Sequence, residues 1–292
     1  MESFHLRFLF IYVVALFQFI DIYTCKKLGR LNIWFPNVVE LELTHVKLVQ
    51  PKSLEVKFDR LKTLAIHQYE ELIESLTIDK MLRLNPQLHT LVLRSEFDLE
   101  FLQSIGENLT HLEVLEVWAP VDRFYNFGDE KVRFENVKKF TLSSQFEWGE
   151  FIVNVPFEFP KLRYLKFDGF NEFKGQLMNF IKLNRDVEQL HLVPNLESWD
   201  DLDINDCNAI VTAMPKLNEL EFCGDTFTHT ELVAFLALNK SLNKVRLWFI
   251  EPPIDYHFRC TLQKNWDLTT RVIEHGCWDA CTVFALELNR KD

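Results

Sequence analysis

Residues 153–167 read VNVPFEFPKLRYLKF, two short apolar stretches separated by one turn at Pro160. Apolar residues alternate in the first stretch, while Leu162, Leu165 and Phe167 give the second the spacing L-x-x-L-x-F. Alternation of this kind is typical of a strand with one buried face. The turn is too short for a hairpin. We therefore expect the first piece to be the return side of one coil and the second to be the strand that follows it.

The same design recurs along the chain. Extended pieces also enter the motif at residues 30–43, 53–66 and 130–142, and helix-like segments enter it at residues 82–93, 105–117, 180–192, 210–222 and 235–247. The middle apolar residues of the nine copies are Leu41, Leu64, Leu91, Leu115, Phe140, Leu165, Leu190, Leu220 and Val245. Successive markers are 23, 27, 24, 25, 25, 25, 30 and 25 residues apart. A period this regular indicates a repeat architecture.

Each repeat contributes one strand with an inward and an outward side. Leu41 and Leu43 are expected to face the core, whereas Glu42 and Thr44 face out. A single strand cannot bury its apolar side alone, so neighbouring repeats stack in parallel and share one core. Helical returns are predicted at residues 98–109, 203–215 and 228–239. The last of these begins with a capping box formed by Thr228 and Glu231.

The repeats resemble the leucine-rich repeat family, whose motif L-x-x-L-x-L sits in units of similar length. The resemblance covers about residues 28–250. It implies an α/β solenoid, a curved horseshoe with a parallel concave sheet and mixed helical and extended convex returns. Regular extracellular members carry an asparagine soon after the strand, and here the matching positions hold Val46, Tyr69, Glu96, Val121 and Gln145. The chain is therefore more similar to irregular ribonuclease-inhibitor-like arrays and to F-box receptors of the divergent insect type.

Three segments follow from this reading. Residues 1–27 form an N-terminal apolar segment, residues 28–250 form an array of about nine repeats, and residues 251–292 form a C-terminal cap. Within the cap, Trp266–Ile273 and Thr282–Leu288 are predicted to be the strands of a β-hairpin, because a solenoid end must hide its exposed edge.

The N-terminal segment leaves the location of the protein open. Its apolar run is short for a membrane span and suits the hydrophobic region of a secretory signal, although its cleavage zone lacks a small-x-small pair. The alternatives are a segment that covers the first edge of the fold, or the remnant of a longer domain. We predict an intracellular location, in the cytoplasm or nucleus, with secretion as the alternative.

Composition and motifs exclude several functions. The net charge of −11 and the absence of a basic run argue against nucleic-acid binding. No P-loop, HExxH, G-x-S-x-G or G-x-G-x-x-G motif occurs. The carboxylates form no recognisable acid/base pair, and His67 and His191 are interpreted as solvated surface residues. We therefore predict a non-enzymatic protein with no cofactor, no catalytic residue and no metal site.

Histidine and cysteine gather near the C-terminus, at His257, Cys260, His275, Cys277 and Cys281. Sulfur and imidazole ligands can bind zinc, but this spacing matches no standard zinc motif. Disulfides such as Cys260–Cys277 or Cys277–Cys281 are a second interpretation and would require secretion. Free buried thiols are the third.

Parallel stacking is expected to align outward residues in columns on the concave face. Aromatic and arginine side chains are the usual anchors of protein interfaces. The predicted partner-binding residues are Arg94, Trp118, Tyr164, Lys166, Asp168, His191, Arg246 and Trp248. The columns mix both signs of charge, which favours a protein partner over a polyanion.

The resemblance to F-box receptors implies substrate recognition in an SCF-type ubiquitin ligase. No F-box is visible, so a Skp1-like adaptor is expected only if that domain is missing from this chain. The alternative is a secreted recognition protein of the immune type. Both interpretations make the chain a non-enzymatic protein–protein interaction module without a membrane span.

Overall fold

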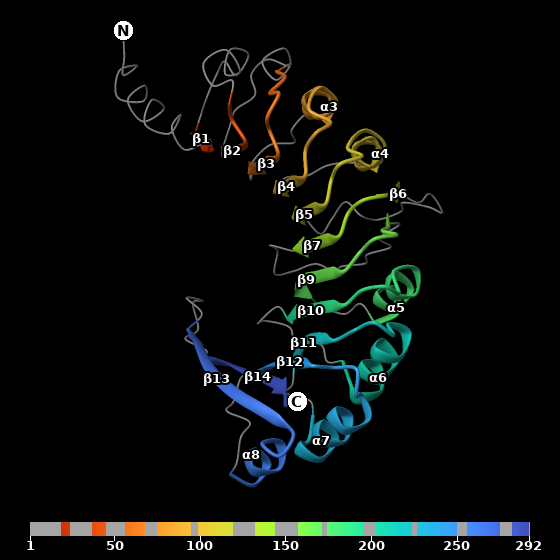
Figure 1. The fold of residues 1–292 in the computed structure, drawn as a ribbon, viewed down its shortest axis with the longest axis vertical. Helices are drawn as coiled ribbons and strands as arrows, with labels where there is room; N and C mark the ends of the chain where they lie inside the picture. The colour runs from red at the N-terminus through yellow and green to blue at the C-terminus, as the bar shows by residue number, and fades with distance from the viewer. Residues whose placement is uncertain are drawn as a thin grey trace. The chain divides into compact units, whose positions relative to one another are not determined.

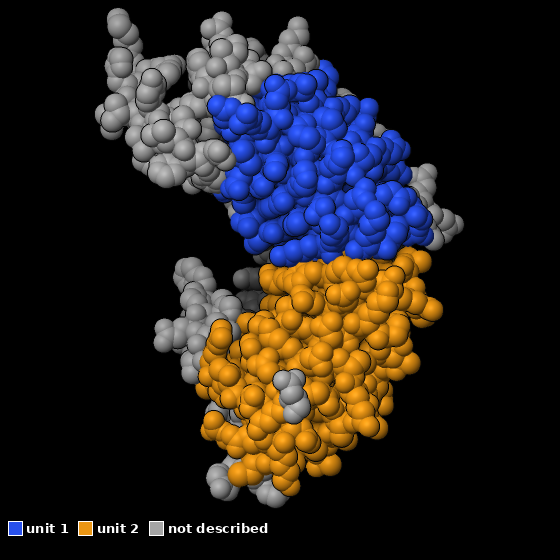
Figure 2. Space-filling model, in the orientation of Figure 1, with its two compact units in different colours: residues 1–123, 127–145, 156–161 blue, residues 124–126, 146–155, 162–292 orange. Residues whose placement is uncertain are grey.

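The structure is a computed structural model. It describes residues 19–23, 37–44, 56–67, 75–94, 99–118, 132–143, 157–170, 174–194, 202–223, 227–249, 256–274 and 282–291. These residues form an α/β fold whose strands are mostly parallel (Figure 1). The chain divides into two compact units (Figure 2). Unit 1 holds residues 1–123, 127–145 and 156–161, and unit 2 holds residues 124–126, 146–155 and 162–292.

In the described part of unit 1, six strands lie side by side in parallel and in chain order. They are β1 (Phe19–Tyr23), β2 (Glu40–Thr44), β3 (Thr63–His67), β4 (Thr90–Arg94), β5 (Val114–Trp118) and β7 (Lys139–Ser143). The helices α3 (Ser75–Leu84) and α4 (Leu99–Asn108) lie along one side of these strands in Figure 1. Strand β1 lies in the N-terminal apolar segment and pairs with β2, so this segment supplies a strand that the repeat count did not include.

The strand register confirms the repeat alignment inside each unit. In unit 1 the markers Leu41, Leu64, Leu91, Leu115 and Phe140 stand directly opposite one another on neighbouring strands. In unit 2 the same holds for Leu165, Leu190, Leu220 and Val245. Every one of these side chains is buried. Because side chains alternate along a strand, this register also fixes which residues face outward.

The backbone hydrogen bonds at the turns before the strands also recur from repeat to repeat. The carbonyl of Val39 accepts hydrogen bonds from the backbone amides of Lys62 and Thr63, and the carbonyl of Lys62 accepts from His89 and Thr90. The same double contact recurs before β11 and β12 in unit 2. Buried turns must satisfy their backbone polar groups, and here each repeat satisfies those of its neighbour.

Phenylalanine rings fill the core beside two short return strands of unit 1. The short strands β6 (Val132–Arg133) and β8 (Phe157–Glu158) pair in parallel, which confirms extended returns at these two places. Val153 and Val155 of the opening stretch lie outside the described residues. The rings that pack here are Phe134, Phe140, Phe157 and Phe159. Aromatic rings of this size replace much of the apolar area that a helix would bring.

Unit 2 repeats the same layout and adds a hairpin. Its parallel strands are β9 (Tyr164–Phe170), β10 (Gln189–Pro194), β11 (Glu219–Cys223) and β12 (Lys244–Phe249). Its helices are α5 (Lys174–Leu183), α6 (Ile204–Ala213), α7 (His229–Leu238) and α8 (Tyr256–Leu262). Strands β13 (Trp266–Glu274) and β14 (Thr282–Arg290) form the predicted antiparallel hairpin, and β14 pairs with β12. Helix α8 was not expected from the sequence.

Helices α6 and α7 begin at well-formed capping boxes. The hydroxyl oxygen of Thr228 accepts a hydrogen bond from the amide of Glu231, whose carboxylate accepts from the amide of Thr228, as predicted. Asp203 and Asp206 form the equivalent pair at α6. Helix α7 packs onto the sheet through contacts such as Phe235 against Phe222. The core of unit 2 therefore lies between the strands and these helices.

Asparagine has a structural role that the sequence analysis missed. Four helices are followed by, or end in, an asparagine whose side-chain amide donates to the carbonyl four residues earlier. These residues are Asn85, Asn108, Asn184 and Asn239. The last carbonyls of a helix lack partners within the helix, and these side chains satisfy one of them each time. The repeats therefore do not carry the asparagine after the strand, but an asparagine recurs at the ends of their helices.

Candidate functional site

The outward side of the strands carries all eight predicted partner-binding residues. We call it the polar face of each unit. In unit 1 it includes Glu42, His67, Arg94, Glu116 and Trp118. In unit 2 it includes Tyr164, Lys166, Asp168, His191, Glu219, Glu221, Lys244, Arg246, Trp248 and Glu287.

In unit 1 the structure brings Arg94 and Trp118 together on one carboxylate. The guanidinium carbon of Arg94 lies 4.1 Å from the centre of the Trp118 ring. The indole Nε1 of Trp118 donates to Oε1 of Glu116 at 2.7 Å, and Nη2 of Arg94 lies 3.4 Å from the same oxygen. Stacking and the shared acceptor fix both side chains, which remain partly exposed. Glu116 therefore orients the two predicted anchors.

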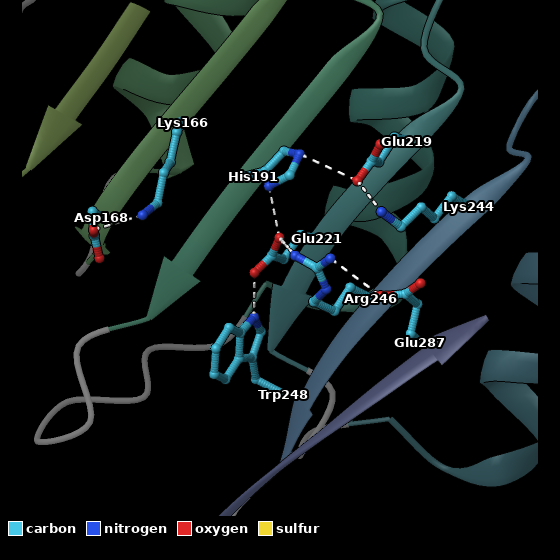
Figure 3. Close-up of polar contacts among 9 residues, drawn as sticks. All are labelled: Lys166, Asp168, His191, Glu219, Glu221, Lys244, Arg246, Trp248 and Glu287. Carbon is cyan, nitrogen blue, oxygen red and sulfur yellow. Dashed lines mark hydrogen bonds and ion pairs between the residues drawn. The ribbon is translucent and has the colours of Figure 1, made fainter. Parts of the chain in front are cut away.

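In unit 2 a buried carboxylate organises the polar face (Figure 3). Glu221 is only 2% exposed. Its Oε2 lies 2.7 Å from Nη1 of Arg246 and 2.7 Å from Nδ1 of His191, and its Oε1 accepts from the indole of Trp248 at 2.8 Å. Three predicted residues, one on β10 and two on β12, thus contact one glutamate of β11, the strand between them.

Further ion pairs surround this centre. Nη2 of Arg246 lies 3.2 Å from Oε2 of Glu287, which stands opposite Arg246 on the hairpin strand β14. Nζ of Lys244 lies 2.9 Å from Oε1 of Glu219. Two of the three remaining predicted residues of unit 2, Lys166 and Asp168, pair with each other at 2.7 Å. The polar face of unit 2 is therefore a network of charged groups.

Burial and neighbouring charges shift the pKa of Glu221 in opposite directions. Burial alone would raise the pKa of Glu221, but the hydrogen bond from His191 and the charge of Arg246 outweigh it and hold this pKa below its ordinary value. Burial raises the pKa of the Tyr164 phenol to about 12, and the negative charges of Glu221 and Glu219 add to this effect. The network therefore keeps Glu221 ionised and Tyr164 neutral.

The two histidines are buried, which corrects the prediction that they are solvated. His67 and His191 are each 8% exposed. Nε2 of His67 lies 3.2 Å from Oε1 of Glu42, and the ring of His191 lies 4.9 Å from that of Tyr164. A histidine at an outward strand position loses its water when long charged side chains from both neighbouring strands cover it. The contact between His191 and Glu221, which are within hydrogen-bonding distance, was not predicted from the sequence.

The residues predicted from the sequence did not include Glu221, nor did they include Glu219, Lys244 or Glu287. The alternation of the strands was sufficient to point Glu219 and Lys244 outward. Glu287 gave no comparable signal, because it lies in the hairpin outside the repeat and meets Arg246 only through antiparallel pairing.

The cysteine and histidine cluster lies mainly outside the described residues, which do not include His275, Cys277 or Cys281. Cys260 is a free thiol. Among the residues that the structure describes, no three metal-ligating side chains gather, and no helix is both long and apolar enough to cross a membrane.

No protein-family model matches the chain, and a search of curated proteins finds no match. Evidence about the function therefore comes from the chemistry of the polar faces themselves. Their carboxylates can accept hydrogen bonds, their guanidinium groups can donate them, and their aromatic rings can stack on a bound group.

Replacing Tyr164 by phenylalanine is expected to change the alkaline behaviour of unit 2. The pKa of Tyr164 is raised from 10.0 to about 12 in the folded state. The neutral phenol therefore stabilises the fold fully below pH 10, and this contribution is lost as the pH rises through about 12. Ultraviolet titration of wild type against Tyr164→Phe should isolate one tyrosine that ionises near pH 12. A difference spectrum with an ordinary midpoint near 10 would contradict this prediction.

Proposed function

We propose that the chain is a leucine-rich-repeat-like solenoid with a non-enzymatic function, and that its polar faces bind a protein partner. In this proposal the strands line the concave side of a horseshoe, the helical and extended returns form its convex side, and the C-terminal hairpin caps its last edge. The in-register repeats and the pairing of β14 with β12 support this arrangement.

One recurring arrangement carries the proposal. In each unit a glutamate accepts from the indole of a tryptophan and from the guanidinium of an arginine on a neighbouring strand. The trios are Glu116, Trp118 and Arg94, and Glu221, Trp248 and Arg246. Tryptophan and arginine dominate the binding energy of protein interfaces. Side chains that are held in place before binding also lose less conformational entropy when a partner docks.

Affinity capture with paired variants tests this function. Wild type, Trp118→Ala and Trp248→Ala would each be expressed with a tag, cross-linked in cells and analysed by mass spectrometry. Truncating an anchor tryptophan should reduce capture of the specific partner by at least about tenfold.

The matched controls truncate exposed apolar residues at helix ends, namely Leu84→Ala in unit 1 and Leu238→Ala in unit 2. Leu84 is 38% exposed and Leu238 is 74% exposed, so both variants should fold and retain the partner. Equal loss in controls and tryptophan variants, or full retention in the tryptophan variants, would refute binding through the polar faces. Circular dichroism of every variant separates lost binding from lost folding.

A further inference from the structure

The charges on the polar face of unit 2 do not balance. Lys166 and Asp168 neutralise each other. Among the described residues of this face, the three glutamates Glu219, Glu221 and Glu287 then share two permanent cations, Lys244 and Arg246. These five side chains together carry one negative charge in excess, in a largely buried setting. A buried charge without a partner is costly, so this face favours an additional cation.

The ring of His191 shows where such a cation could be held. Nδ1 lies 2.7 Å from Oε2 of Glu221, so a neutral ring donates through Nδ1 and presents Nε2 as an acceptor. Nε2 has no hydrogen-bond partner among the described residues, although the side chain is nine-tenths buried. Oε1 of Glu219, also an acceptor, lies 3.5 Å away. Two acceptors therefore face each other and lack a shared donor.

The surroundings of this pair favour a guanidinium over other cations. The Tyr164 ring lies against His191, with ring centres 4.9 Å apart, and aromatic rings stack well on guanidinium groups. A guanidinium offers several N–H donors in a fixed plane, so neighbouring donors can serve Nε2 and Oε1 together. The side chain of Lys244 is 30% exposed, so it can share Glu219 with an incoming group or turn towards solvent. The net charge of −11 attracts basic segments from a distance.

We propose that the polar face of unit 2 binds an arginine-containing basic segment of a protein partner. The arginine guanidinium of that segment takes the place of the Lys244 ammonium at Oε1 of Glu219 and donates to Nε2 of His191, which is shielded from solvent in the free protein. This inference rests on the proposed function, because it specifies the chemistry of the partner that the face recognises. It adds Glu219 and His191 as the residues that determine specificity.

The test uses the full chain and a fluorescent peptide of Arg-Gly-Ser repeats. A peptide with citrulline in place of arginine keeps the shape and removes the charge, and a peptide with glutamate reverses it. Fluorescence anisotropy should show binding of the arginine peptide, weaker binding at high salt, and no measurable binding of the other two. Glu219→Gln should raise the Kd by about tenfold.

Glu188→Gln is the matched control, because Glu188 is an exposed glutamate of unit 2 that pairs with Arg163 outside the polar face. This control should change the Kd by less than about twofold. Equal weakening by both substitutions would show diffuse attraction and overturn the proposal, as would equal binding of the citrulline peptide. His191→Phe should weaken binding as well. If a cellular partner depends on Trp248 while the arginine peptide fails, this inference is wrong and the proposed function stands.

Discussion

Asn85→Ala is expected to destabilise the protein by about 3–5 kcal/mol, the largest effect that we foresee for a single substitution outside the polar faces. The Asn85 side chain is fully buried. Its Oδ1 accepts from the amide of Phe58 at 2.8 Å, and its Nδ2 donates to the carbonyls of Val56 at 2.9 Å and Met81 at 2.7 Å. Alanine leaves these three backbone groups buried without their partner, and each costs about 1–3 kcal/mol.

Urea unfolding followed by circular dichroism measures this loss, and hydrogen exchange at Phe58 shows whether its amide opens. The control is Asn108→Ala, which removes the equivalent helix-end contact to Ser104 from a partly exposed site. It should cost about 1 kcal/mol. Similar losses in both variants would contradict the bridging role of Asn85 between the return segment of one repeat and the helix of the next.

Glu221→Gln is expected to cost about 2–4 kcal/mol at neutral pH. Glutamine keeps the shape of the side chain but removes its negative charge. The Glu221 carboxylate balances the charge of Arg246 and accepts hydrogen bonds from His191 and Trp248. One amide oxygen cannot replace two carboxylate oxygens, so at least one of these donors loses its acceptor. Thermal unfolding and urea unfolding at pH 7 measure the change. A loss below about 0.5 kcal/mol, the range of neutral surface changes, would contradict the central role of Glu221.

The effect of Glu221→Gln on stability should depend on pH in the acid range. The pKa of Glu221 is lowered from 4.5 in the folded state, so its charge stabilises the fold fully above pH 4.5. This contribution is lost as the pH falls below 4.5 and passes through the folded pKa. The stability difference between wild type and Glu221→Gln should therefore shrink in acid. Lys216 and Asp186 form an exposed pair in the same unit, so Asp186→Asn serves as a control with little effect at pH 7.

Most residues of the polar faces could be predicted from the sequence, but their hydrogen-bond partners could not. Strand alternation predicted that Arg94 and Trp118 both face outward, and in the structure they stack on each other. It did not indicate that Glu116 would orient both, because nothing in a single repeat shows which acceptor a side chain will choose. His191 was misjudged for the same reason. Its burial depends on Glu219 and Glu221, which arrive from the next strand about one repeat later.

The sequence by itself determined the strands and their register. Apolar residues at alternate positions must face a core, and a period near 25 residues lets successive strands align only when their markers stand opposite each other. Only the tertiary structure decided which polar groups meet. Glu287 reaches Arg246 through the antiparallel hairpin, and Asn85 reaches Phe58 across 27 residues. Burial of apolar side chains follows a local pattern, whereas a hydrogen bond depends on distances and directions that exist only after the repeats have packed.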